Sequence, residues 1–152
     1  MRTLTAFLCL TFAVLLFGAG VSWSADFQKE LTAYESGDFA TALREWKPLA
    51  EKDDAPSQTM MGSLFMIGSG VPQNYVEAAK WFRLAADQGF PAAQTNLSGM
   101  YLNGWGVEKN IDMRIKLQIR AAEQGFAKAQ VLLGSNYVTG QFIPKNYAKA
   151  LK

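Results

Sequence analysis

The sequence predicts an all-α protein built from repeated pairs of helices, and two observations support this fold class. Residues 55–90 align with residues 91–126 at a period of 36 residues, without a gap. Within each block, apolar or small residues recur at i, i+4 and i+8, which is the spacing of one buried helix face. Self-similarity at such a period is typical of repeat architectures, in which each repeat is one supersecondary unit.

The aligned blocks share many identical residues. The first two blocks match at Gln58/Gln94, Gly68/Gly104, Gly70/Gly106, Val71/Val107, Asn74/Asn110, Lys80/Lys116, Gly89/Gly125 and Phe90/Phe126. A third block begins at Ala127 and keeps Gln130, Gly134, Tyr137, Gly140 and Asn146 in phase, but stops before the period is complete. We therefore expect repeat units at residues 55–90, 91–126 and 127–152.

The first helix of each unit is predicted from its apolar stripe and from the glycine that follows it. In the first unit the stripe is Ser57, Met61 and Phe65, and Gly68 is expected to end the helix as a left-handed cap. The later units repeat the stripe with Ala93, Leu97 and Tyr101, and with Ala129, Leu133 and Tyr137.

The second helix of each unit is predicted to begin after an asparagine N-cap, which is Asn74 in the first unit. Glu77 follows three residues later, a spacing close to that of a capping box. Ala78, Trp81, Phe82 and Ala85 form the expected buried stripe, and Gly89 ends the helix. Residues 26–54 look like a shortened helix pair, with a turn at Gly37 and a second helix from Phe39 to Ala50.

The first 25 residues have the features of a secretory signal peptide. Arg2 provides a positive start, an uncharged apolar stretch follows, and small residues precede an expected cleavage after Ser24 or Ala25. The alternative is an uncleaved anchor, because the uncharged stretch could just span a bilayer. Cleavage would export the protein to the periplasm or the medium, and no later segment predicts a membrane span.

Composition argues against several functions. The chain has no histidine and one cysteine, Cys9, which lies within the predicted signal peptide. Ser–His and Cys–His nucleophile pairs and zinc sites of the usual kind therefore cannot be built. The net charge is only +2 and no basic block is present, which disfavours a nucleic-acid partner. We expect no catalytic residue, metal or cofactor, and we interpret the acidic residues at 51, 53 and 54 as a solvated turn.

The repeat resembles that of a known family. The pattern A-x-x-x-L-G-x-x-Y-x-x-G-x-G-V, followed by N-Y-x-x-A-x-K-W-x-x-x-A-A-x-Q-G, is similar to the Sel-one-like repeat, a relative of the tetratricopeptide repeat. The residues that carry it are Met61, Gly62, Phe65, Gly68, Gly70, Val71, Ala78, Lys80, Trp81, Ala85, Ala86 and Gly89, with their partners 36 residues later. The resemblance implies an α-solenoid of antiparallel helix pairs, with residues 26–54 as a tetratricopeptide-like pair, and a role in protein–protein interaction in bacterial envelopes.

The same resemblance implies a binding groove on the concave side, where the first helices lie. Its predicted lining is small, weakly polar and uncharged, and would suit a partner segment with apolar anchors. The predicted residues are Thr59, Ser63, Met66 and Ile67 in the first unit, Thr95, Gly99, Leu102 and Asn103 in the second, and Val131, Ser135, Val138 and Thr139 in the third. Trp105 occupies a loop position held by Ser69 and Gln141 in the other units, so it is predicted either to contact a ligand or to pack on a neighbouring loop.

Three residues depart from the family pattern. Leu117 stands where the first unit has Trp81, and Arg114 occupies a position where the family has a small alanine. Phe142 replaces the second loop glycine, so the third loop is expected to take another path, because a left-handed non-glycine residue costs about 1–2 kcal/mol. The third unit stops midway through its second helix, which predicts a longer array, or self-association or partner binding through this end.

These inferences predict a non-enzymatic adaptor of the bacterial cell envelope that binds a protein partner on its concave face. One alternative is a cell-wall-acting or β-lactam hydrolase, which has been proposed for some relatives of this repeat family. Another is a wall-glycan binder that does not cleave its ligand, for which Trp105 would be the stacking platform.

Overall fold

The computed structural model describes residues 32–146 and Lys149. The predicted signal peptide, the start of the N-terminal helix pair (residues 26–31) and the last residues of the third unit lie outside the described residues. Within the described ranges every regular element is a helix, and this confirms the predicted all-α fold.

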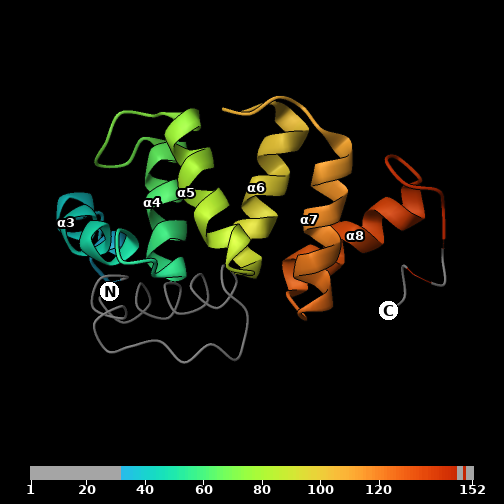
Figure 1. Ribbon diagram of the computed structural model, residues 1–152, viewed down its shortest axis with the longest axis horizontal. Coiled ribbons are helices and arrows are strands. Elements are labelled where there is room, and N and C mark those ends of the chain that lie inside the picture. Colours follow the sequence, from blue (N-terminus) through green and yellow to red (C-terminus); the bar gives the residue numbers. More distant parts are fainter. Residues whose placement is uncertain (1–31, 147–148, 150–152) are drawn as a thin grey trace, which may run out of the picture.

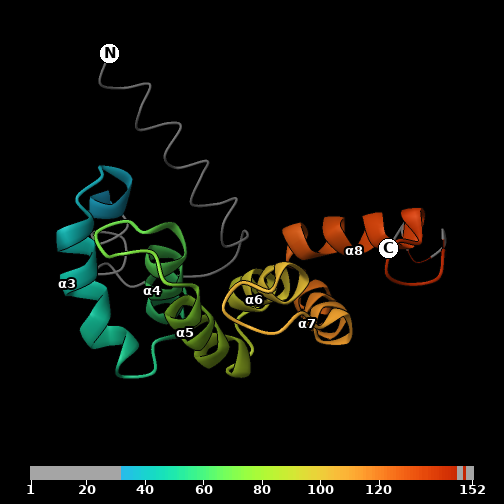
Figure 2. The ribbon, with the colours of Figure 1, turned by 90° about the horizontal axis from the view of Figure 1, so that it is seen from above.

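The helices follow one another along the long axis of the molecule (Figures 1 and 2). After a helical turn at residues 32–35, they are α3 (Phe39–Ala50), α4 (Ala55–Ile67), α5 (Tyr75–Asp87), α6 (Pro91–Asn103), α7 (Ile111–Glu123) and α8 (Ala127–Thr139). Each helix packs chiefly on the helices before and after it in the chain, and the closest pairs are α4 with α5 and α6 with α7. This arrangement is the predicted solenoid of helix pairs.

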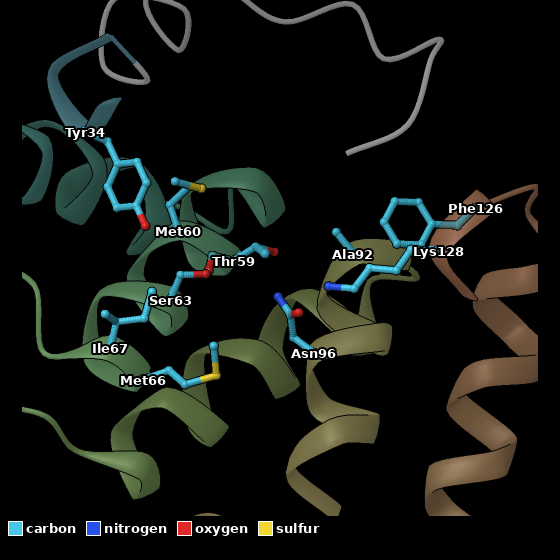
Figure 3. A pocket seen from close by; sticks show the side chains of 10 residues that line it. All are labelled: Tyr34, Thr59, Met60, Ser63, Met66, Ile67, Ala92, Asn96, Phe126 and Lys128. Carbon is cyan, nitrogen blue, oxygen red and sulfur yellow. The ribbon is translucent and has the colours of Figure 1, made fainter. Parts of the chain in front are cut away.

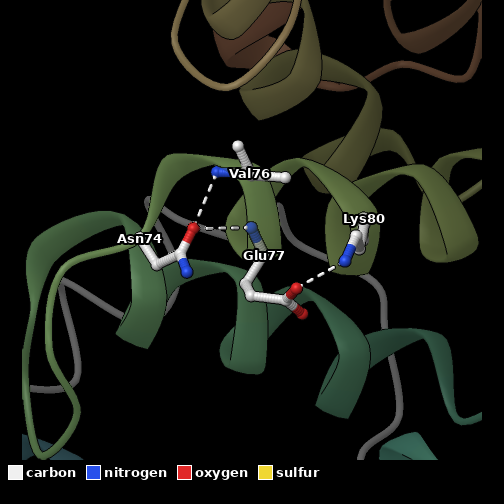
Figure 4. Close-up of polar contacts among 4 residues, drawn as sticks. All are labelled: Asn74, Val76, Glu77 and Lys80. Atoms are coloured by element: carbon white, nitrogen blue, oxygen red, sulfur yellow. Dashed lines mark hydrogen bonds and ion pairs between the residues drawn. The ribbon is translucent and has the colours of Figure 1, made fainter.

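The predicted helix ends are confirmed by their backbone geometry. Gly68, Gly104 and Gly140 end the first helices with φ angles of 82°, 76° and 69°, a left-handed conformation that favours glycine. The Asn74 side chain accepts hydrogen bonds from the backbone N–H groups of Val76 and Glu77, each at 3.1 Å (Figure 4). Asn110 and Asn146 form equivalent caps.

The capping box that Glu77 suggested does not close. The Glu77 carboxylate pairs with Lys80 instead (Figure 4), and the backbone N–H of Asn74 donates to the carbonyl of Phe65 at 2.8 Å. Because that N–H already has a partner in the preceding helix, Glu77 is not needed to satisfy it.

Buried glutamines join successive helix pairs. The Gln58 side chain, fully buried, donates to the carbonyl of Ala50 at the end of α3 and accepts from Gln88 at 2.8 Å. Gln94 repeats this pattern one period later, with Ala86 and Gln124 as its partners. The carbonyls of Ala50 and Ala86 lie at helix ends, where each also accepts a backbone N–H from the residue three positions later, and the glutamine supplies a second donor from the next helix. The glutamines that recur in the sequence therefore link one repeat to the next.

The core of the first unit depends on a close approach of two helices. Phe82 of α5 is fully buried, and its ring lies against Gly62 of α4. A Cβ atom at Gly62 would lie 2.7 Å from the Phe82 ring, which is too close for any side chain. The small residue at position 62 thus sets the distance between the two helices.

The loop of the third unit differs from the other two, as predicted. In the second unit, Gly106 has a φ of 65°, and a Cβ atom there would lie 2.1 Å from the backbone carbonyl oxygen of Tyr75. Phe142 occupies the equivalent position in the third unit and is not left-handed, since Asp53 is the one non-glycine residue with positive φ in the described ranges. The loop is rearranged, and the Phe142 ring covers Arg114.

No helix in the described ranges has the length and apolar character needed to cross a bilayer. The same ranges contain no cluster of three or more His, Cys, Asp or Glu residues that could hold a metal ion.

Candidate interaction groove

Two adjoining pockets form a groove along the first helices of the three repeats, α4, α6 and α8. The α4–α6 pocket encloses about 160 Å³ and the α6–α8 pocket about 250 Å³. Met66, Asn96 and Lys128 line both pockets, so the two form one surface, which we call the first-helix groove.

The α4–α6 pocket is lined by side chains from three repeats (Figure 3). α4 contributes one wall, Ala92 and Asn96 of α6 lie opposite, and Lys128 extends from the start of α8 toward them. The complete lining is Tyr34, Thr59, Met60, Ser63, Met66, Ile67, Ala92, Asn96, Phe126 and Lys128.

The α6–α8 pocket lies one repeat further along and includes residues from the second helix α7. Its lining is Met66, Thr95, Asn96, Ser98, Gly99, Met100, Leu102, Trp105, Arg114, Gln118, Lys128 and Leu132. The pocket therefore combines apolar side chains with two cationic ones, Arg114 and Lys128.

Most of the groove residues predicted in the first two units line these pockets. Thr59, Ser63, Met66 and Ile67 lie in the α4–α6 pocket, and Thr95, Gly99, Leu102 and Trp105 lie in the α6–α8 pocket. The hydroxyl groups among them are already used, because Thr59, Ser63 and Thr95 each donate to a carbonyl four residues earlier in their own helix. Those three side chains therefore form part of the groove wall, but their hydroxyl groups have no proton left to donate to a ligand.

The structure places five predicted groove residues outside both pockets. Asn103 is exposed and its side chain donates to the carbonyl of Gly99. Val131, Ser135, Val138 and Thr139 are exposed on α8, with Val131 at 72%. Each pocket lies between the first helix of one repeat and that of the next, and within the described ranges no further first helix follows α8.

The expectation of an uncharged groove is wrong. Lys128 lines both pockets and Arg114 lines the second, while none of the acidic residues that the structure describes lines either one. These cations were missed because the prediction considered the outward positions of each first helix alone. The pockets also take residues from the first turn of the following repeat and from α7. The signal was present in the sequence as a departure from the repeat: Lys128 replaces Pro56 and Ala92, and Asn96 replaces Met60.

Arg114 is the most unusual residue of the groove, since it is a cation with only 5% of its surface exposed. Its guanidinium lies 4.1 Å from the centre of the Phe142 ring, and Nη2 donates to Asn136 Oδ1 at 3.4 Å. Asn136 in turn donates to Gln118 Oε1 at 2.9 Å. The Nη1 atom is buried and has no hydrogen-bond partner among the described residues, and burial lowers the pKa of the guanidinium.

Trp105 packs on the neighbouring repeat, which is close to one of the two roles that the sequence left open. Its ring stacks on Tyr75 of α5, with ring centres 5.3 Å apart and an angle of 11° between the planes. The residue is still 42% exposed, and it lines the α6–α8 pocket. Packing on the neighbouring repeat thus holds an exposed aromatic side chain at the edge of the groove.

The stacked helix pairs and the groove along their first helices define an α-helical repeat protein of the solenoid class. The sequence profile of the Sel1 repeat matches residues 55–90, 91–126 and 127–152. The chain therefore belongs to the Sel1 repeat family, as its resemblance to the Sel-one-like repeat predicted.

Two solved structures support this assignment. A Sel1 repeat protein from Oxalobacter formigenes is 32% identical with a TM-score of 0.75, over 82% of this chain and 51% of that one. A protective antigen present in uropathogenic Escherichia coli strains, which displays an SLR fold, is 35% identical with a TM-score of 0.68, over 72% of this chain and 24% of that one. The chain thus spans about half or less of the length of these relatives. No curated protein matches the sequence.

Sel1 repeat proteins generally mediate protein–protein interaction, and the family is typically a non-catalytic scaffold.

Proposed function

We propose that this protein is an exported adaptor of the bacterial cell envelope that binds a segment of a protein partner along the first-helix groove. The observation that carries the proposal is the groove itself, which extends over three repeats and is lined by Met66, Leu102 and Leu132. Apolar side chains in a continuous groove are suited to the anchors of an extended or helical segment.

The envelope location rests on the charge pattern of the first 25 residues. N-terminal sequencing of the protein isolated from its native compartment tests it directly. We expect the chain to begin at Ala25 or Asp26. An intact Met1 in the membrane fraction would instead identify the segment as an anchor.

Site-specific photocrosslinking in the native cell tests the groove. A benzoylphenylalanine at Ile67 or Leu102 lies in the groove, whereas the same residue at Leu84, which is 47% exposed on α5, serves as the control. We expect one partner to be crosslinked from both groove positions and not from Leu84. Crosslinking of that partner only from Leu84 would move the interface to the second helices.

The exposure of Trp105 favours a second candidate, a wall-glycan binder, because an indole ring can stack on a sugar face. Co-sedimentation with purified peptidoglycan distinguishes the two. Binding that is lost in Trp105→Ala, with no protein crosslinked from Leu102, would favour the glycan.

A further inference from the structure

The groove has an excess of positive charge that nothing in the described chain balances. The ion pairs among the described residues are Arg44 with Glu45 and Lys80 with Glu77, and both lie outside the groove. Lys128 forms no ion pair within the ranges that the structure describes. Because no carboxylate of the described residues lines either pocket, the charged side chains that line the groove would attract an anion.

Arg114, which is almost fully buried, adds to the positive charge of the α6–α8 pocket. A buried cation is normally paired with a carboxylate, because desolvation disfavours the charged form. Within the part of the chain that the structure describes, the partners of the guanidinium are an aromatic ring and one long hydrogen bond to an amide, and Nη1 has no partner. In repeat one the equivalent residue is Ala78, so the helix pair does not require a cation at this position. The charge is better explained by something that binds beside it.

The neighbours of the two cations indicate the rest of the ligand. Asn96 lines both pockets together with Lys128, and the structure gives its side chain no hydrogen bond within the described ranges. Its amide can therefore donate to and accept from a peptide backbone. Met66, Leu102 and Leu132 provide the apolar walls.

We propose that the α6–α8 pocket binds a carboxylate of the partner segment, with Lys128 in direct contact, Arg114 supplying additional positive potential and an apolar side chain of the segment against Met66 and Leu102. This inference rests on the proposed function and specifies the chemistry of the partner. We assign the carboxylate to an Asp or Glu side chain within the segment, because the groove continues on both sides of Lys128 and Asn96, whose amide can pair with a peptide backbone that runs through both pockets.

The test uses four small probes on the full processed protein: N-acetyl-Leu-Leu, its C-terminal amide, N-acetyl-Leu-Glu-amide and N-acetyl-Leu-Gln-amide. Binding is followed through methionine methyl groups by NMR. Met66 and Met100 line the α6–α8 pocket, whereas Met61 and Met113 line neither pocket and serve as internal controls. We expect Met66 and Met100 to shift with N-acetyl-Leu-Glu-amide, and the matched N-acetyl-Leu-Gln-amide to bind at least about tenfold more weakly. A preference for the acid in the Leu-Leu pair alone would overturn the assignment to a side-chain carboxylate. The first pair tests a C-terminal carboxylate and the second pair a side-chain carboxylate.

Two lysine variants test whether Lys128 causes the preference for the carboxylate probe. Lys128 is exposed, so Lys128→Gln is expected to fold normally and to remove the preference for the carboxylate. Lys116→Gln removes the same charge from an exposed position outside both pockets and should leave the preference intact. In Arg114→Met the preference should be reduced, and added salt should weaken it in the native protein.

Equal binding of acid and amide probes at Met66 and Met100 would overturn the carboxylate inference while leaving a groove that binds peptides. Absence of any shift at these methyls would also overturn it, and the crosslinking experiment would then decide the proposed function independently. An equal loss of the preference for the carboxylate in Lys116→Gln and Lys128→Gln would overturn the inference, because the preference would then depend on the net charge of the protein and not on the pocket.

Discussion

The packing of α5 against α6 can be compared with that of α7 against α8 position by position, because the 36-residue period places equivalent residues in both. In the first interface the positions hold Ala78, Phe82 and Met100, all buried in one apolar cluster. In the second they hold Arg114, Gln118 and Asn136, which are equally buried and joined by hydrogen bonds.

The difference shows that the repeat geometry does not require an apolar core at these positions, provided that the polar groups change together. Asn136 accepts from Arg114 and donates to Gln118, so each replacement supplies a partner for another. Because Arg114 and Gln118 also line the α6–α8 pocket, the polar interface lies directly behind the part of the groove where we propose that a carboxylate binds.

We expect the largest change in the free energy of unfolding from a variant that disrupts the apolar interface. Phe82→Ala removes a fully buried ring and should lower the free energy of unfolding by about 3–5 kcal/mol. Gln118→Ala, at the equivalent position, loses one hydrogen bond and should cost about 1–3 kcal/mol. Urea unfolding of both variants measures the difference. Because the Phe82 ring also packs on Gly62 of α4, equal losses would show that Gln118 stabilises its position as much as the ring stabilises the equivalent one.

A smaller effect tests the close approach of α4 to α5. Gly62→Ala places a methyl group 2.7 Å from the Phe82 ring and should cost about 1–3 kcal/mol through overpacking. Gly99→Ala is the matched control in α6, where a Cβ atom meets nothing within 4 Å. That variant should gain about 0.5–1 kcal/mol, because alanine loses less entropy than glycine in a helix. A gain in stability from Gly62→Ala would mean that the helices can separate at little cost.

The two glycines also show how far the sequence could predict this structure. The period located every described helix of the three repeats, and the glycine and asparagine positions identified their ends, because caps depend on local backbone geometry. The close contact between Gly62 and Phe82 was not predicted, because it depends on how two helices pack on each other and not on the backbone geometry of either one.

The groove was predictable only in part, for a physical reason. Residues such as Met66 and Leu102 were found because a repeat places them on the same face of each first helix. Lys128 and Arg114 reach the groove from the next repeat and from a second helix, so their position depends on how repeats stack on one another. The Arg114 network further requires the rearranged loop that carries Phe142, which the sequence predicted only as a loop that departs from the repeat.

The smallest expected effect concerns Arg114 itself. Arg114→Met relieves the desolvation of a buried charge, which favours the folded state. Against this, it removes the contact with Phe142, of about 0.5–2 kcal/mol, and leaves Asn136 Oδ1 without its donor. Because these contributions oppose one another, we expect the free energy of unfolding to change by less than about 1 kcal/mol, with an unchanged denaturant m-value. A loss above about 3 kcal/mol would identify Arg114 as a structural requirement of the α7–α8 interface. A near-neutral change, together with weaker carboxylate binding, would mean that the charge is retained for the ligand, because the fold does not depend on it.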